Sequence, residues 1–208
     1  MMKTTESILL SAEQTLETMK FGLDDYLGKN PKRRETGLRN MIVFGRAVTN
    51  VIQNLRSTVG KDIFSEWYVP WQQRMKEDKV MKAFYKMRTE ILKEGKLDTL
   101  VSVKNLELNP YRYQELFKNP PTNAQSFFIG DQLGGSGWII PLPDGSEEKY
   151  YIEFPDEWGI EVSLELKNLP NVSEPDMGEK YQNTQDMALY YYQFLGALVN
   201  NAKVTFLY

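Results

Sequence analysis

The chain has 208 residues, of which 41% are hydrophobic and 25% are charged, and its formal net charge is −3. These values are typical of a globular protein with one domain, or one domain and a small appendage, and they exclude nucleic-acid binding through overall charge. The sequence contains no Cys and no His, which excludes disulfides, thiolate catalysis, catalytic triads and histidine–metal sites in this chain.

Helical periodicity begins near the N-terminus. Apolar residues recur at steps of three and four over residues 6–27, which predicts a first helix. Asn30 and Pro31 open a second helix that reaches Gly60, with Gly37 as a point where it could divide. We interpret the polar stripe beside its apolar face as a solvated flank, with a binding site as the alternative. This stripe consists of Arg39, Arg46, Asn50 and Gln53.

Two further helices follow. The segment FSEWYVPWQQRM, residues 64–75, predicts a helix that Pro70 breaks, because proline lacks a backbone donor. Its aromatic residues, Trp67, Tyr68 and Trp71, suit the core at one end of a bundle, and a platform for base stacking is the alternative. Asp78 caps a fourth helix that ends at Gly95. Four helices with short connections predict an antiparallel bundle.

The composition changes after Pro120-Pro121, where short alternating runs are separated by Gly, Pro and Asp. The pattern predicts an antiparallel meander of about three strands over residues 126–168, with a hairpin turn at Pro143-Asp144-Gly145. A polar loop over residues 171–178 precedes a tyrosine-rich final helix at residues 179–201, and residues 203–208 favour a terminal strand. The predicted fold is therefore α+β. A helical bundle occupies residues 1–118, and a β-meander with the final helix, residues 122–208, packs on it.

The stretch MRTEILKEG, residues 87–95, resembles the motif of the HEPN superfamily. That motif is an Arg, four to six residues and then a His, commonly with Asn after the Arg and Gly soon after the His. The matching positions are Arg88, Thr89 at the Asn, Lys93 at the His and Gly95. With FSEWY and LRNMIVFGRAVTNVIQNLR, the resemblance covers roughly residues 5–96.

The resemblance implies a helical bundle, often dimeric, whose active members cut RNA without metal, the Arg handling phosphate charge and the His acting as acid and base. Lys93 departs from this pattern, because an ammonium has no acceptor and must lose a proton before it can act as a base. On a regular helix, Arg88 and Lys93 also lie about 140° apart. The alternative for Arg88 is packing on the core and pairing with Glu90 or Glu94. The candidate catalytic residues are Arg88 and Lys93, and the candidate RNA contacts are Arg39, Arg46 and Arg88.

A second nuclease candidate lies in EVSLELK, residues 161–167, where Glu165-Leu166-Lys167 resembles the acidic-x-Lys motif of restriction-type nucleases. Those enzymes hold Mg²⁺ with an Asp and a Glu on neighbouring strands, which would assign Asp144 and Glu165. A hairpin turn explains Asp144 better, and alternating charges are typical of the solvated face of a strand. The glycine-rich residues 130–138 lack the Lys-Ser/Thr of a phosphate loop and predict a mobile loop. PKRR, residues 31–34, predicts a solvated helix start, with phosphate contact as the alternative.

The sequence predicts a HEPN-like module, non-catalytic or weakly active, that binds RNA or a protein partner in bacterial stress response or phage defence. One alternative is a nuclease that uses Arg88 and Lys93 or a Mg²⁺ site near Glu165. The other is a structural interaction module whose contact surface is the tyrosine-rich helix. We expect a homodimer without cofactor or resident metal. No segment approaches the ~20 apolar residues of a membrane span and no signal peptide is recognisable, which predicts a cytoplasmic protein without membrane contact.

Overall fold

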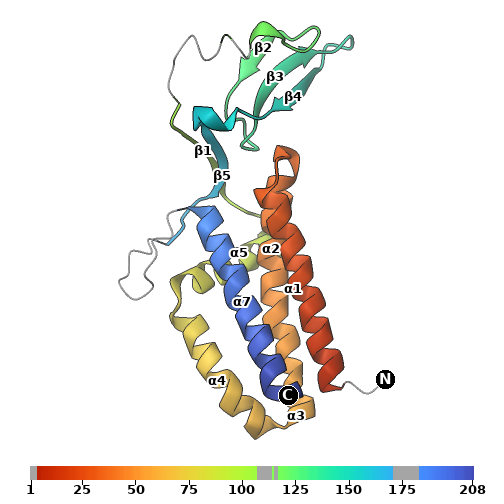
Figure 1. Ribbon diagram of the computed structural model, residues 1–208, viewed down its shortest axis with the longest axis vertical. Coiled ribbons are helices and arrows are strands. Elements are labelled where there is room, and N and C mark those ends of the chain that lie inside the picture. The colour runs from red at the N-terminus through yellow and green to blue at the C-terminus, as the bar shows by residue number, and fades with distance from the viewer. Residues whose placement is uncertain (1–3, 107–113, 115–116, 171–182) are drawn as a thin grey trace. The chain divides into compact units, whose positions relative to one another are not determined.

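The computed structural model describes residues 4–106, 114, 117–170 and 183–208. The chain divides into two compact units (Figure 1). The helical unit contains Met1–Leu27, Thr36–Asp98 and Leu166–Tyr208, and the β unit contains Gly28–Glu35 and Thr99–Glu165. This division differs from the expected boundary between residues 118 and 122, because the final helix belongs with the N-terminal helices and the β unit begins with residues from before position 118.

The predicted α+β class is confirmed at the level of N-terminal helices, small sheets and a C-terminal helix. The helices are α1 (Thr5–Leu27), α2 (Pro31–Ile52), the 3₁₀ turn η1 (Gln53–Leu55), α3 (Arg56–Val59), α4 (Lys61–Glu77), α5 (Lys79–Glu94) and α7 (Thr184–Leu207). Helix α2 runs through Gly37 without a break, and Gly60, with a φ of 93°, separates α3 from α4. Among the described helices, none is both long and apolar enough to cross a membrane.

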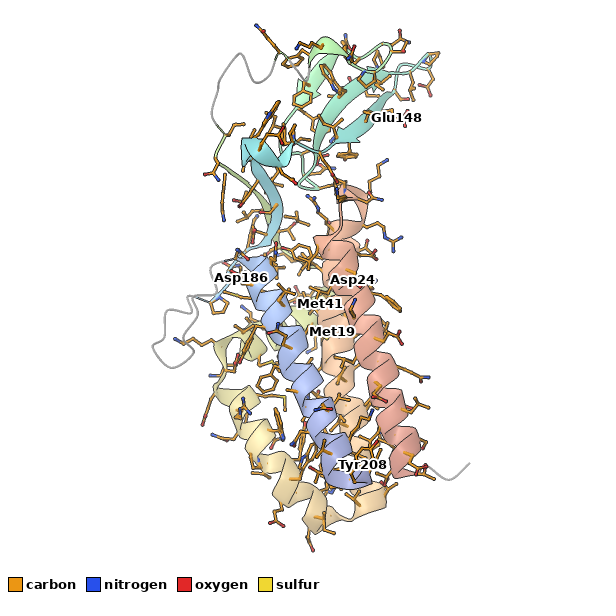
Figure 2. The ribbon with its side chains drawn as sticks, in the orientation of Figure 1. Met19, Asp24, Met41, Glu148, Asp186 and Tyr208 are labelled. Carbon is orange, nitrogen blue, oxygen red and sulfur yellow. The ribbon has the colours of Figure 1, made fainter. Side chains whose placement is uncertain are left out.

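Helices α1 and α2 approach each other so closely that glycine is required on both. A Cβ on Gly22 would lie 2.6 Å from the backbone nitrogen of Met41, and one on Gly37 would lie 2.6 Å from the carbonyl oxygen of Gly22. Met19 and Met41, both fully buried, belong to the core formed by these helices (Figure 2). The glycine that we expected to divide α2 therefore serves close packing instead.

Helix α4 is continuous through Pro70, so the predicted break is wrong. A proline inside a helix removes one hydrogen bond, and contacts on either side of it can offset that loss. Here the ring nitrogens of Trp67 and Trp71 both donate to Oδ1 of Asn201 on α7, at 2.7 and 3.2 Å. The Trp71 ring also packs edge-on against Phe194 of α7. These contacts hold α4 against α7 on both sides of the proline.

The final helix α7 continues to Leu207, so the predicted terminal strand at residues 203–208 is wrong. Ala202 is fully buried, Lys203 pairs with Glu13 of α1, and Phe206 packs against Trp67. Tertiary contacts at a helical spacing thus override the β preference of the segment. The predicted loop at residues 171–178 and the predicted start of the helix at residue 179 lie outside the described residues.

Two small sheets form the β unit. One has the order β2 (Ser126–Phe128), β3 (Ser136–Pro141), β4 (Glu147–Ile152), with antiparallel pairing in which Trp138 faces Phe127 on one side and Tyr150 on the other. The other pairs β1 (Thr99–Lys104) with β5 (Glu161–Leu166). The meander and its turn at residues 143–145 are confirmed. The assignment of residues 161–166 to that meander is wrong, because this strand pairs with one from before residue 118.

The loop between β2 and β3 is organised around the carboxylate of Asp131, whose side chain is only 6% exposed. Its Oδ1 accepts from the backbone N–H groups of Leu133 and Gly135, and its Oδ2 accepts from Lys149 and from the hydroxyl of Tyr151. We predicted a mobile loop, and the structure shows instead a loop held by one buried acid. Burial acts to raise the pKa of Asp131, but the hydrogen bonds to its carboxylate outweigh burial and lower that pKa.

The basic start of α2 is also less solvated than predicted. Arg34 donates to the carbonyl oxygens of Gly134 and Val162, which belong to different strands or loops of the β unit. Lys32 lies over the ring of Tyr151, 5.8 Å from its centroid. These residues therefore hold the β unit together, and the prediction of a solvated helix start is wrong for Arg34.

Candidate functional site

The two residues of the HEPN-like motif lie on one regular helix. Arg88 is half-buried in the middle of α5, whereas Lys93 is exposed in its last turn. The separation of five residues places their side chains about 140° apart around the helix axis. Nε of Arg88 is buried and has no hydrogen-bond partner among the described residues. The structure thus does not gather Arg88 and Lys93 on one surface of a single chain.

Arg39, the first candidate RNA contact, binds the C-terminal end of α5. Its guanidinium donates to the carbonyl oxygen of Gly95 at 2.9 Å. Gly95 is the left-handed residue that ends α5, with a φ of 66°, and the start of the helix is capped by Asp78, which accepts from the N–H of Met81. A cation at a helix C-terminus also interacts favourably with the helix dipole. Arg39 therefore stabilises α5 and lies outside the cavity described next.

Arg46, the second candidate, lines a cavity of about 450 Å³ in the helical unit. We call this cavity the basic pocket. Its three cationic lining residues are Arg46 of α2, Lys76 of α4 and Lys82 of α5, and its three aromatic ones are Tyr68, Tyr85 and Tyr191. Because α4, α5 and α7 converge on α2, residues far apart in the sequence meet here.

Tyr191 forms the floor of the basic pocket. It is 3% exposed, and its ring stacks on Phe84 of α5 with 4.6 Å between centroids. The other constraint is Gly45 of α2, where a Cβ would lie 2.4 Å from Cε1 of Tyr191. The floor is thus fixed between a phenylalanine and a glycine, and no ligand could pass through it without moving the ring.

The charges of two arginines act on the buried phenol of Tyr191. Burial raises the pKa of Tyr191, and the charges of Arg46 and Arg88 act in the opposite direction. Burial likewise raises the pKa of Tyr68, against the charge of Arg46. Both phenols are therefore neutral hydrogen-bond donors at physiological pH. Two of the residues that the sequence marked, Arg46 and Arg88, thus both act on the charge state of Tyr191.

The walls of the pocket orient Arg46. Its Nη1 donates to the buried hydroxyl of Thr49, which in turn donates to the Arg46 carbonyl, and its guanidinium lies over the ring of Tyr85 at 5.3 Å. Tyr85 is 55% exposed, so it belongs to the rim. Gln53 and Gln72 add amide groups, and Nε2 of Gln53 donates to the carbonyl of Thr49, which leaves its oxygen as an acceptor.

The charge of the pocket is not balanced within the helical unit. Among the described residues, no Asp or Glu lines it, and neither Lys76 nor Lys82 pairs with a carboxylate. Lysines elsewhere in the unit do pair, for example Lys86 with Glu90 and Lys203 with Glu13. A chain with a net charge of −3 thus carries a local site with an excess of positive charge.

The second nuclease candidate, Asp144 and Glu165, does not form a comparable cluster of charged side chains. Asp144 lies in the exposed hairpin turn, where its carboxylate accepts from the N–H and hydroxyl of Ser146. Glu165 accepts from the hydroxyl of Ser163 on the same strand. Within the described ranges, no group of three or more acidic residues lies close enough to hold a metal ion. Lys167 borders a hollow of about 110 Å³ that mixes Lys86 and Lys96 with Glu90, Glu94 and Asp98.

Several pocket residues were missed from the sequence. Lys76, Lys82 and Tyr85 look like ordinary residues on solvated helix faces, and Tyr191 was noted only as part of the tyrosine-rich final helix, which one alternative made a contact surface. The structure places Tyr191 and Phe194 in the core, and the hydroxyl of Tyr190 donates to Asp78. Two signals were available: the polar stripe on α2, of which Arg46 and Gln53 line the pocket, and the aromatic group in residues 64–75, of which Tyr68 does.

Comparison with known protein families identifies a similarity over part of the chain. Residues 24–126, just under half of the chain, match the model of a family described as bacteriophage lambda protein ea47. This region supplies every lining residue of the basic pocket except Tyr191. No curated protein matches the chain, and neither does any solved structure.

Proposed function

We propose that the protein is a non-catalytic RNA-binding module whose helical unit holds single-stranded RNA at the basic pocket. The observation that supports this proposal most directly is a cavity in which three cations lie beside tyrosine rings and, among the described residues, no carboxylate lines the walls. Single-stranded nucleic acid is bound by this combination, because cations attract the phosphates and aromatic rings stack on the bases. Gln53 and Gln72 supply amides of the kind that bond to base edges.

The chemistry of the chain supports a role without catalysis. Cleavage without metal requires a group that takes a proton from the ribose hydroxyl, and histidine is the usual one. The sequence has no His, and Lys93 is exposed and points away from the side of α5 that carries Arg88. On this proposal, Arg88 contributes positive charge behind Tyr191 rather than a reacting group.

The resemblance to HEPN proteins supports an RNA-related role, and it suggests bacterial stress response or phage defence as the setting. The similarity to a bacteriophage protein family is compatible with a role in the encounter between phage and host. The same resemblance supports a homodimer. Binding of a protein partner instead of RNA is the competing interpretation, which the following experiment separates.

The test is fluorescence anisotropy with a short single-stranded RNA at several salt concentrations. Arg46→Gln should weaken binding and reduce the slope of log affinity against log salt by about 0.7, because one phosphate contact is lost. Lys86→Gln is the matched control, since Lys86 is exposed, pairs with Glu90 and lies outside the pocket. RNA that binds both variants and the parent protein equally would show that the pocket is not the RNA site.

A further inference from the structure

The number of charges in the basic pocket indicates which part of a nucleotide it holds. Arg46, Lys76 and Lys82 line one cavity of about 450 Å³. A cavity of this size accommodates one small ligand rather than a run of nucleotides. One small ligand in this cavity can therefore meet all three cations.

A phosphate within an RNA strand is a poor match for this site. An internal phosphodiester carries a single negative charge, which would leave most of the cationic charge uncompensated. A terminal phosphate monoester carries about 1.5 to 2 negative charges at neutral pH and offers three acceptor oxygens. Lys76 and Lys82, on the two helices that meet at the rim, together with Arg46 supply charged donors for three such oxygens.

The shape of the pocket agrees with an end rather than a passing strand. Tyr191 closes the floor between Gly45 and Phe84, so a chain can enter only from the rim. The exposed ring of Tyr85 lies at that rim with one face covered by the Arg46 guanidinium. A base can stack beside it while the phosphate reaches the cations.

We infer that the basic pocket binds a nucleotide through a terminal phosphate, either a free nucleotide or the 5′-phosphorylated end of an RNA. This inference rests on the proposed function and specifies its ligand. Arg46, Lys76 and Lys82 hold the phosphate, Tyr191 and Tyr68 donate from the floor, and Tyr85 faces the base.

The experiment compares two RNAs of identical sequence, labelled at the 3′ end, one with a 5′-phosphate and one with a 5′-hydroxyl, with adenosine monophosphate as competitor. The 5′-phosphorylated RNA should bind about tenfold more tightly, the effect of one additional charge-assisted hydrogen bond. Lys82→Gln should abolish this preference, whereas Lys86→Gln, one turn further along α5, should keep it. Both lysines are exposed, so neither change threatens folding.

The outcomes separate the two proposals. Equal affinity for both RNAs would overturn the inference and leave RNA binding in place. Binding of adenosine monophosphate without binding of either RNA would refute the RNA-binding proposal and support a site for free nucleotides. Failure of both RNAs and of the mononucleotide to bind would overturn both. A preference for the 5′-phosphate that survives in Lys82→Gln would place the phosphate outside the pocket.

Discussion

Replacement of Gly45 by alanine tests the floor of the pocket. The added Cβ would lie 2.4 Å from Cε1 of Tyr191 and 2.7 Å from its Cζ, well inside van der Waals contact. The ring cannot retreat freely, because its other side stacks on Phe84. Overpacking of this kind costs about 1–3 kcal/mol. The better helix propensity of alanine offsets about 1 kcal/mol, so we expect a net loss of up to about 2 kcal/mol in the free energy of unfolding.

Gly196→Ala is the matched control, because it makes the same change inside a helix of the same unit. A Cβ at position 196 would meet only Cδ2 of Leu16, at 3.9 Å. This variant should gain up to about 1 kcal/mol from helix propensity alone. Urea unfolding followed by far-ultraviolet circular dichroism measures both free energies. If Gly45→Ala is as stable as Gly196→Ala, Tyr191 does not pack on Gly45, and the closed floor of the pocket is refuted.

Four further outcomes are expected. In EDTA, neither the parent protein nor Arg88→Ala should cleave single-stranded or hairpin RNA; cleavage by the parent alone would assign Arg88 a catalytic role. Gly22→Ala should lower the urea midpoint, because its Cβ would meet the backbone of α2 at 2.6 Å, and an unchanged midpoint would contradict the close contact of α1 and α2. The pKa of Asp131 is lowered by folding, so its contribution to stability is present above the usual carboxyl pKa of 3.8 and is lost as pH falls through the lower folded value. Asp131→Asn should therefore flatten the acid side of the stability profile, and a profile identical to the parent would rule out this role. Light scattering should give twice the mass of one chain, and a monomer at all concentrations would remove the support for a HEPN-like dimer.

Local sequence rules predicted the features that depend on a few neighbouring residues. Helix α5 is the clearest case, since Asp78 caps its start and Gly95 adopts the left-handed conformation at its end. The hairpin turn at Pro143-Asp144-Gly145 was found in the same way, from residue types that suit a tight turn. The hydrogen bonds and backbone conformations that begin and end such elements involve residues within about one helical turn of each other in the sequence.

Features that depend on distant partners were missed. Pro70 on its own predicts a break in the helix. The sequence does not show that Trp67 and Trp71 both donate to the side-chain oxygen of Asn201 on another helix, α7. Strand β5 looks like the last strand of a meander, but its partner β1 lies far earlier in the chain. Periodicity shows which face of an element is buried and does not show what covers it.

The basic pocket depends both on neighbouring residues of one helix and on distant residues of other helices. The sequence therefore indicated only some of its residues. Arg46 and Gln53 stood out because they share a stripe on one helix, whereas Lys76 and Lys82 reach the same cavity only through the turn between α4 and α5. The N–H of Met81 and the hydroxyl of Tyr190 both donate to the carboxylate of Asp78, and the bond from Tyr190 ties that turn to α7. The net charge of −3 hides the site, because the acidic residues that outnumber the basic ones lie elsewhere. A local excess of charge is a property of the arrangement in space, and only a fold that keeps carboxylates away from these three cations can produce it.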